Sequence, residues 1–260
     1  MLALIAGEGA LPTAIHQAVD DVLVCEMKGF PSGLPDPLVF EVERLGSFLR
    51  DLRKRGVTEV CFAGAVRRPK VDMKRIDLRT APLVPRVMKA MGQGDDGLLR
   101  VVIGLFEEQG MAVRGAHELV PSLLPEAGIL TEAQPGERDE SDADRAAEVQ
   151  AALAAADVGQ ACVVAKGQAL AVETLGGTDW MLRTLAQGRP EGPDGGVLYK
   201  APKAGQDRRI DLPVVGPGTV QGASDAGLSG IVIEAGGVMV LEREATVAAA
   251  DAKGLFLWVR

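Results

Sequence analysis

Short apolar runs alternate with longer helix-like segments through the first half of the chain, and this alternation constrains the fold most. Predicted strands cover residues 2–7, 22–27, 58–66 and 111–116, and predicted helices cover residues 8–19, 39–56, 81–92 and 96–110. Strands separated by helical segments of this length are typical of parallel β-α-β units. We therefore expect an α/β fold whose N-terminal domain, residues 1–132, is a Rossmann-like parallel sheet.

The second half has a different pattern. Residues 133–141 are polar, contain Pro and Gly and lack apolar periodicity, so they are predicted to be a linker. Beyond it we expect an Ala-rich helix over 143–157 that begins at a Ser141–Asp144 capping box, β-hairpins over 161–174 and 230–242, helices over 178–187 and 243–254, and a strand over 255–260. This order predicts a C-terminal α+β domain, residues 142–260.

Composition excludes some functions. Aromatic residues make up 3% of the chain and the net charge is −8, so a nucleic-acid-binding role is not expected. Residues 50–89 nevertheless hold twelve Lys and Arg against four Asp and Glu. Such a basic region suits an anionic small molecule or an anionic membrane surface. A solvated helix and loop would explain it equally well.

The cysteines and the chain start indicate the compartment. Cys25, Cys61 and Cys162 each lie in an apolar run, and their odd number and wide spacing predict buried thiols in a reducing compartment. The N-terminus lacks the basic region of a signal peptide, and no apolar run reaches about 18 residues. A soluble cytoplasmic protein is expected, with peripheral membrane contact left open.

Glycine-containing turns follow two predicted strands. In "GEGALP", the glycines would allow an anion to approach the amides of a helix N-terminus, and Gly9 and Leu11 are candidate binding residues. Pro12 stands where a dinucleotide-binding fingerprint needs Gly, so a dinucleotide is not favoured, and a nucleotide-sugar stays open as the ligand. In "FAGAVRRPK", Gly64 and Ala65 lie at the C-terminal end of a predicted strand, which is the ligand-binding edge of an open parallel sheet.

Charged residues beside these turns suggest phosphate or cation binding. Arg67 and Arg68 follow Ala65 and would clamp a phosphate, although a surface loop with two solvated arginines is the commoner arrangement. In "GQGDDGLLR", Gly94 precedes the acids Asp95 and Asp96, which suit a cation or a sugar hydroxyl, or simply start a helix.

The second half supplies a further anion site. Gly177 and Thr178 in "VETLGGTDWMLR" form a cradle at a helix start, where Asp179 would oppose a phosphate unless a metal bridges them. An ordinary capped helix is the alternative. In "LYKAPKAGQDRRIDLPVVGP", Lys200, Lys203 and Gln206 are candidate phosphate ligands.

Two aspartates of this half, Asp211 and Asp225, are also candidates for a specific role. In the same stretch, period-2 spacing puts Arg209 and Asp211 on one face of a predicted strand, where they would pair. Asp225, among small residues in "GASDAGLSG", is a candidate Mg²⁺ ligand or base, although a surface helix acid is an equally simple interpretation.

Some familiar catalytic patterns are missing. The chain has two histidines, His16 and His117, which argues against a di-metal phosphoesterase site, and it has no GxSxG, P-loop or HExxH motif.

Several blocks together resemble a known family. They are "FAGAVRRP", "GDDGLL", "ADVGQACVVAKGQALAVET", "GGTDWML", "APKAGQDRRIDLPVVGPGTV" and "AGLSGIVIEAGGVMVLEREATVAAAD". The chain thereby resembles, from Gly7 to Asp251, the UDP-2,3-diacylglucosamine pyrophosphatases of lipid A synthesis that lack the calcineurin-like fold. One departure is Gly176, where the family pattern has an acid.

The resemblance implies a Mg²⁺-dependent hydrolase that splits UDP-2,3-diacylglucosamine into UMP and 2,3-diacylglucosamine 1-phosphate, with the active site between two domains. It implies Asp225 as the catalytic residue, and we take Asp225 and Asp179 as the candidate metal ligands. The residues expected to bind substrate are Gly9, Leu11, Gly64, Ala65, Arg68, Gly94, Asp95, Gly177, Thr178, Asp179, Lys200, Lys203 and Gln206. A homodimer and peripheral contact with the inner membrane are further expectations. The alternative is a non-catalytic nucleotide-sugar-binding module, which would serve regulation or transport.

Overall fold

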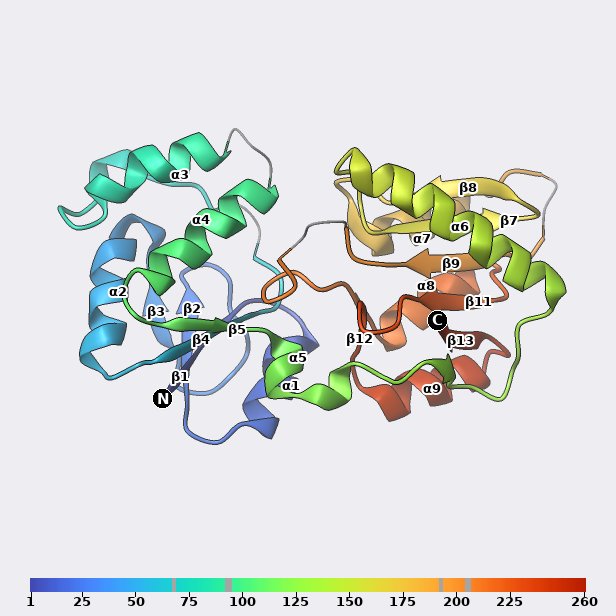
Figure 1. Ribbon diagram of the computed structural model, residues 1–260, viewed down its shortest axis with the longest axis horizontal. Helices are drawn as coiled ribbons and strands as arrows, with labels where there is room; N and C mark the ends of the chain where they lie inside the picture. The colour runs from blue at the N-terminus through green and yellow to red at the C-terminus, as the bar shows by residue number, and fades with distance from the viewer. Residues whose placement is uncertain (67–68, 92–94, 192–193, 204–206) are drawn as a thin grey trace. The chain divides into compact units, whose positions relative to one another are not determined.

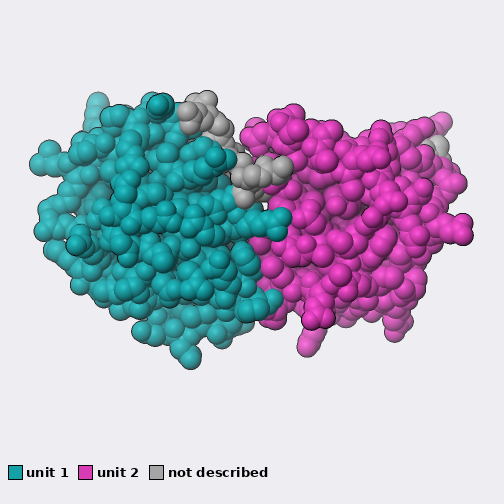
Figure 2. Space-filling view, in the orientation of Figure 1, with its two compact units in different colours: residues 1–121, 207–211 teal, residues 122–206, 212–260 magenta. Residues whose placement is uncertain are grey.

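The computed structural model describes residues 1–66, 69–91, 95–191, 194–203 and 207–260. The chain divides into two compact units (Figure 2). Unit 1 comprises Met1–Pro121 and Asp207–Asp211, and unit 2 comprises Ser122–Gln206 and Leu212–Arg260. A short segment of the second half, Asp207–Asp211, thus belongs to the first unit, and we call it the strap.

Unit 1 is built on a five-stranded parallel sheet in the order β3-β2-β1-β4-β5 (Figure 1). Its strands are β1 (Leu2–Ala6), β2 (Val22–Met27), β3 (Leu38–Phe40), β4 (Glu59–Ala63) and β5 (Ala112–Arg114). Its helices are α1 (Ala10–Ala18), α2 (Leu45–Lys54), α3 (Val84–Met91), α4 (Asp95–Glu107) and α5 (Ala116–Leu119), with 3₁₀ turns η1 (Val42–Arg44), η2 (Met73–Arg75) and η3 (Ala81–Leu83). The strand order reverses between β1 and β4, which creates a topological switch point at their carboxyl ends.

The single helix predicted over residues 39–56 is wrong at its start. Residues 38–40 form strand β3 beside β2, and the α-helix begins only at Leu45. Phe40 of this strand stacks on Phe48 of α2, with ring centroids 4.0 Å apart. Tertiary packing on β2 thus overrides the local helical pattern.

Unit 2 contains a six-stranded mixed sheet in the order β6-β13-β11-β9-β7-β8 and a separate parallel pair, β10 and β12. Its strands are β6 (Gly128–Ile129), β7 (Ala161–Ala165), β8 (Gln168–Val172), β9 (Val197–Lys200), β10 (Val214–Val215), β11 (Gly230–Ile233), β12 (Met239–Val240) and β13 (Phe256–Val259). Its helices are α6 (Glu137–Ala155), α7 (Gly177–Gln187), α8 (Pro217–Asp225) and α9 (Arg243–Asp251), and η4 (Pro121–Leu123) leads into it.

Two cores cover opposite faces of this sheet. Along β7, Cys162 and Val164 pack with Ala146 of α6, whereas Val163 packs with residues of α7, α8 and α9 such as Leu182. This alternation is the period of a strand buried on both faces. Unit 2 is therefore a three-layer arrangement, and the predicted fold class is confirmed for both halves of the chain.

Predictions for the second half had mixed outcomes. The hairpin over 161–174 is confirmed as β7 and β8, which pair antiparallel. The hairpin over 230–242 is wrong, because β11 lies between the parallel strands β9 and β13 and has no free edge for β12. Helix α6 begins at Glu137, inside the predicted linker, and the Asp139 carboxylate accepts a hydrogen bond from the Gly136 amide at 3.0 Å.

The prediction of buried thiols is confirmed. Cys25, Cys61 and Cys162 are free and buried, and burial raises the pKa of each thiol to about 12. Among the described residues, no helix is both long and apolar enough to cross a bilayer.

Candidate functional site

The turns after β1 and β4 meet at the switch point of unit 1. Glu8 and Ala65 exchange two backbone hydrogen bonds, with N···O distances of 3.0 and 2.8 Å. The two turns approach so closely that a Cβ atom on Gly64 would lie 2.8 Å from backbone atoms of Gly7 and Glu8. Gly64 also has φ +88°, which favours glycine. The glycine in this turn is therefore a steric requirement.

Predicted binding residues of unit 1 gather at this edge. The structure brings together Gly9 at the start of α1, Leu11 in its first turn, Gly64 and Ala65. Arg67, Arg68, Gly94 and Gln206 lie outside the described residues, and Asp95 is described only as the first residue of α4. An anionic ligand suits the switch point, because helix α1 begins there.

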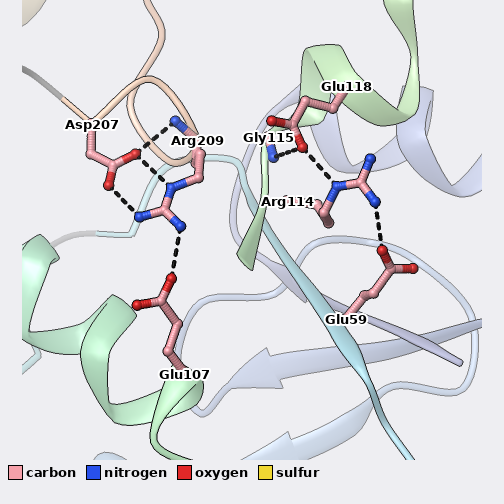
Figure 3. A network of polar contacts seen from close by, with 7 residues as sticks. All are labelled: Glu59, Glu107, Arg114, Gly115, Glu118, Asp207 and Arg209. Atoms are coloured by element: carbon pink, nitrogen blue, oxygen red, sulfur yellow. Dashed lines mark hydrogen bonds and ion pairs between the residues drawn. The ribbon is translucent and has the colours of Figure 1, made fainter. Parts of the chain in front are cut away.

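Arg209 connects the strap to helix α4 of unit 1 (Figure 3). Arg209 donates to both carboxylate oxygens of Asp207, at 3.0 and 2.7 Å, and to Glu107 at the end of α4, at 2.7 Å. Hydrogen bonds from Arg209 lower the pKa of Asp207. Next to Arg209 in the strap, Ile210 packs on the core of unit 1.

The strap also corrects a prediction. Residues 208–210 form a turn rather than a strand, and Arg209 pairs with Asp207 and Glu107 instead of Asp211. The strap lies beside the end of β5, because a Cβ atom on Gly115 would be 3.4 Å from the Arg209 Cα atom. Arg114 fixes this strand end by donating to Glu59 and Glu118 at 2.6 and 2.7 Å (Figure 3).

We expect Arg209→Met to loosen the strap. The substitution removes hydrogen bonds to two carboxylates, and because the arginine is partly exposed we expect a loss of about 1–2 kcal/mol of unfolding free energy. Hydrogen exchange at the strap amides should accelerate. Arg145→Met, which removes an exposed pair with Glu148, is the matched control, with a loss of about 0.5 kcal/mol or less. Equal losses in the two variants would contradict an anchoring role for Arg209.

In unit 2, a buried cation lies among the residues that were predicted to bind phosphate. Lys200, the last residue of β9, has 7% of its surface exposed, and its Nζ atom donates to Thr178 Oγ1 at 2.7 Å. The Thr178 hydroxyl in turn donates to the Glu173 carboxylate. A buried ammonium is stable only with such partners. The chain of contacts therefore fixes a positive charge at the first turn of α7.

Glu173 was not predicted as a site residue. It follows β8, and its contact with Thr178 spans the Gly176–Gly177 turn, where Gly177 has φ +77°. Glu173 thus supplies the carboxylate that the Thr178 hydroxyl contacts. The two glycines between a strand and a helix predicted a tight turn, but no sequence feature indicated which acid the Thr178 hydroxyl would contact.

The remaining charged candidates of unit 2 are more exposed. Asp179 lies in the first turn of α7 and is exposed. Lys203 forms an ion pair with Asp157 at 2.6 Å. The structure thus brings Gly177, Thr178 and Lys200 together, with Asp179 beside them.

Asp225 lies away from this group. It ends α8, five residues before the start of β11, and β9 and β11 are parallel and in register. The chain therefore enters β11 at the edge where β9 begins, whereas Lys200 lies where β9 ends. Asp225 is exposed, and its Oδ1 atom accepts a hydrogen bond from Gln221 at 2.6 Å.

The structure places the two candidate metal ligands on different elements. Asp179 lies in the first turn of α7, at the Lys200 edge, and Asp225 ends α8 at the other edge, so the fold of unit 2 does not bring the two carboxylates together. Within the part of the chain that the structure describes, no group of three or more His, Cys, Asp or Glu residues is arranged to hold a metal. No described residue is therefore assigned to Mg²⁺.

Comparisons with known proteins cover nearly the whole chain. The family model for the LpxI N-terminal domain matches residues 1–123, and the model for the LpxI C-terminal domain matches residues 126–258. The chain is also 39% identical over 269 residues to the UDP-2,3-diacylglucosamine pyrophosphatase LpxI of Caulobacter vibrioides, covering 98% of this chain and 96% of that protein.

Proposed function

The chain belongs to the LpxI family, and we propose that it hydrolyses the pyrophosphate of UDP-2,3-diacylglucosamine to UMP and 2,3-diacylglucosamine 1-phosphate. The observation that carries this proposal is the near-complete match to the Caulobacter pyrophosphatase. The reaction would serve lipid A synthesis in the cytoplasm. Contact with the inner membrane and a homodimer stay predictions.

The buried cation of unit 2 supports a role in diphosphate chemistry. Hydrolysis of a diphosphate builds negative charge on phosphoryl oxygens, and fixed positive groups stabilise that charge. In our proposal Lys200 supplies the charge, Thr178 orients its ammonium group, and the amides at the start of α7 add the positive end of a helix dipole. Gly9, Leu11, Gly64 and Ala65 are proposed to bind the nucleotide-sugar.

Mg²⁺ dependence is also part of the proposal. Its support is the family resemblance and the general use of Mg²⁺ with substrate phosphates. We derive no step that depends on the ion, because no cluster of three or more His, Cys, Asp or Glu residues in the described part of the chain is arranged to hold a metal.

Phosphorus NMR tests the proposed function. UDP-2,3-diacylglucosamine is incubated with the full chain, once with Mg²⁺ and once with a chelator. We expect the diphosphate signals to be replaced by those of UMP and a sugar 1-phosphate only when Mg²⁺ is present. Turnover in the chelator would contradict the metal requirement alone. A bound but unchanged diphosphate would contradict hydrolysis and favour the nucleotide-sugar-binding module.

A further inference from the structure

Exposed apolar side chains are concentrated in one stretch of unit 1. Of the ten large apolar side chains exposed among the described residues, six lie within residues 66–91, a tenth of the chain. They are Val66, Val71, Met73, Leu78, Met88 and Met91. Exposed apolar residues are ordinary when scattered singly, whereas several of them near one another on a surface are typical of an interaction site.

The most exposed of these side chains is held in place by a well-anchored turn. Leu78 is 93% exposed. Beside it, the Asp77 carboxylate accepts hydrogen bonds from Ser47 Oγ at 2.5 Å and from the Thr80 amide at 2.7 Å. The Thr80 hydroxyl accepts from the Gly46 amide at 2.9 Å. The turn is thereby fixed to the start of α2, and Leu78 is presented to solvent by a fixed backbone.

Helix α3 has two of the exposed apolar side chains on one face. Val87 packs on the core of unit 1 and Ala90 is buried, so one side of α3 is turned inward against α4 (Figure 1). Met88 and Met91 are three residues apart, and this spacing places them on one helix face. Both are exposed. The inner face of α3 is thus already satisfied within unit 1, and the methionines are available to a partner.

Positive charge accompanies the apolar side chains. Residues 66–91 contain eight Lys and Arg and two Asp, in a chain of net charge −8. Arg75 and Arg86 form ion pairs with Glu41 and Glu108. Four further cations are exposed and form no ion pair with the residues the structure describes: Lys70, Lys74, Arg79 and Lys89.

We propose that residues 66–91 dock unit 1 onto an anionic phospholipid surface. Apolar side chains enter the boundary between headgroups and acyl chains, and lysines and arginines meet the phosphates of the lipids. The mixture of both kinds of side chain favours this partner, because two weak signals are needed for stable membrane binding. This interaction is independent of hydrolysis.

Vesicle flotation of the full chain tests this surface. We expect binding to vesicles of phosphatidylethanolamine and phosphatidylglycerol, at least tenfold weaker binding to phosphatidylcholine alone, and weaker binding at high salt. Lys74→Glu with Lys89→Glu should weaken binding to the anionic vesicles at least tenfold, and Met73→Ser with Leu78→Ser should also weaken it. The matched control reverses two exposed cations of unit 2, Arg138→Glu with Lys253→Glu, and should bind normally.

Two results would overturn the proposal. One is a full chain that does not bind the anionic vesicles, or that binds equally well when residues 74 and 89 are reversed. The other concerns the oligomeric state, measured by sedimentation. If the full chain is an oligomer, and if Met73→Ser with Leu78→Ser makes it a monomer without changing vesicle binding, the surface binds a second copy of the chain and not a membrane. Each variant is first checked by circular dichroism. Activity on a short-chain substrate without vesicles is measured separately, so that loss of docking and loss of hydrolysis are distinguished.

Discussion

We expect Lys200→Met to lower kcat/KM for diphosphate hydrolysis by about 100-fold or more, the effect of removing one preorganised charge-stabilising group. Methionine is similar in length to lysine and suits the buried position, but it has no charge to offer a phosphate. The Thr178 hydroxyl would lose the ammonium that it now accepts from. The variant should remain folded, which circular dichroism and thermal unfolding would verify before the kinetics are compared.

Two further variants separate this role from a structural one. Thr178→Val keeps the charge of Lys200 but removes the hydroxyl that orients it, so a smaller loss, about tenfold, is expected. Lys253→Met, which removes an exposed cation of unit 2, is the control, and it should retain activity within about threefold. If Asp225→Asn were inactive while Lys200→Met kept its activity, the site would have to be placed at the edge where β9 and β11 begin.

The second large effect is expected for Gly64→Ala. A residue other than glycine at φ +88° costs about 1–2 kcal/mol. The new methyl group would also lie 2.8 Å from the backbone of the β1 turn, and relieving such overpacking costs about 1–3 kcal/mol more. The variant should therefore unfold at a markedly lower temperature and urea concentration than the parent.

Gly56→Ala is the matched control for this prediction. Gly56 has φ +79°, but no atom lies within 4 Å of the position of its Cβ. It therefore carries the conformational cost without the collision. Unfolding of both variants is measured in parallel. Equal losses of stability would mean that the turns after β1 and β4 can separate at little cost, and that their closeness does not matter to the fold.

Local patterns predicted the elements that their own residues determine. The buried run of β1 and the β7–β8 hairpin were visible in the sequence, because apolar side chains and a Lys-Gly turn specify them directly. Strand β3 was hidden in a helical pattern, since its place depends on β2 and on stacking of Phe40 against Phe48. The final pairing of β11 was equally hidden, because it depends on two strands far away in the chain.

In the candidate site, too, local features were predictable from the sequence and long-range contacts were not. Gly64, Thr178 and Lys200 were predicted because glycines, helix starts and strand ends are local features. The contact between Glu173 and Thr178 was not predictable, since it depends on the path of a short loop. Asp225 was chosen for its small neighbours, yet only the direction of β11 reveals on which edge of the sheet it lies.

The strap has a consequence for how the protein is made. Unit 1 needs Asp207–Asp211, and Ile210 among them packs on its core, so a nascent chain that has emerged only as far as Pro121 still lacks a part of that unit. The ribosome must first translate much of unit 2. Unit 1 is therefore completed only after residues 122–206 of unit 2 have been made, and a gene split after Pro121 would encode two fragments of which the N-terminal one is incomplete.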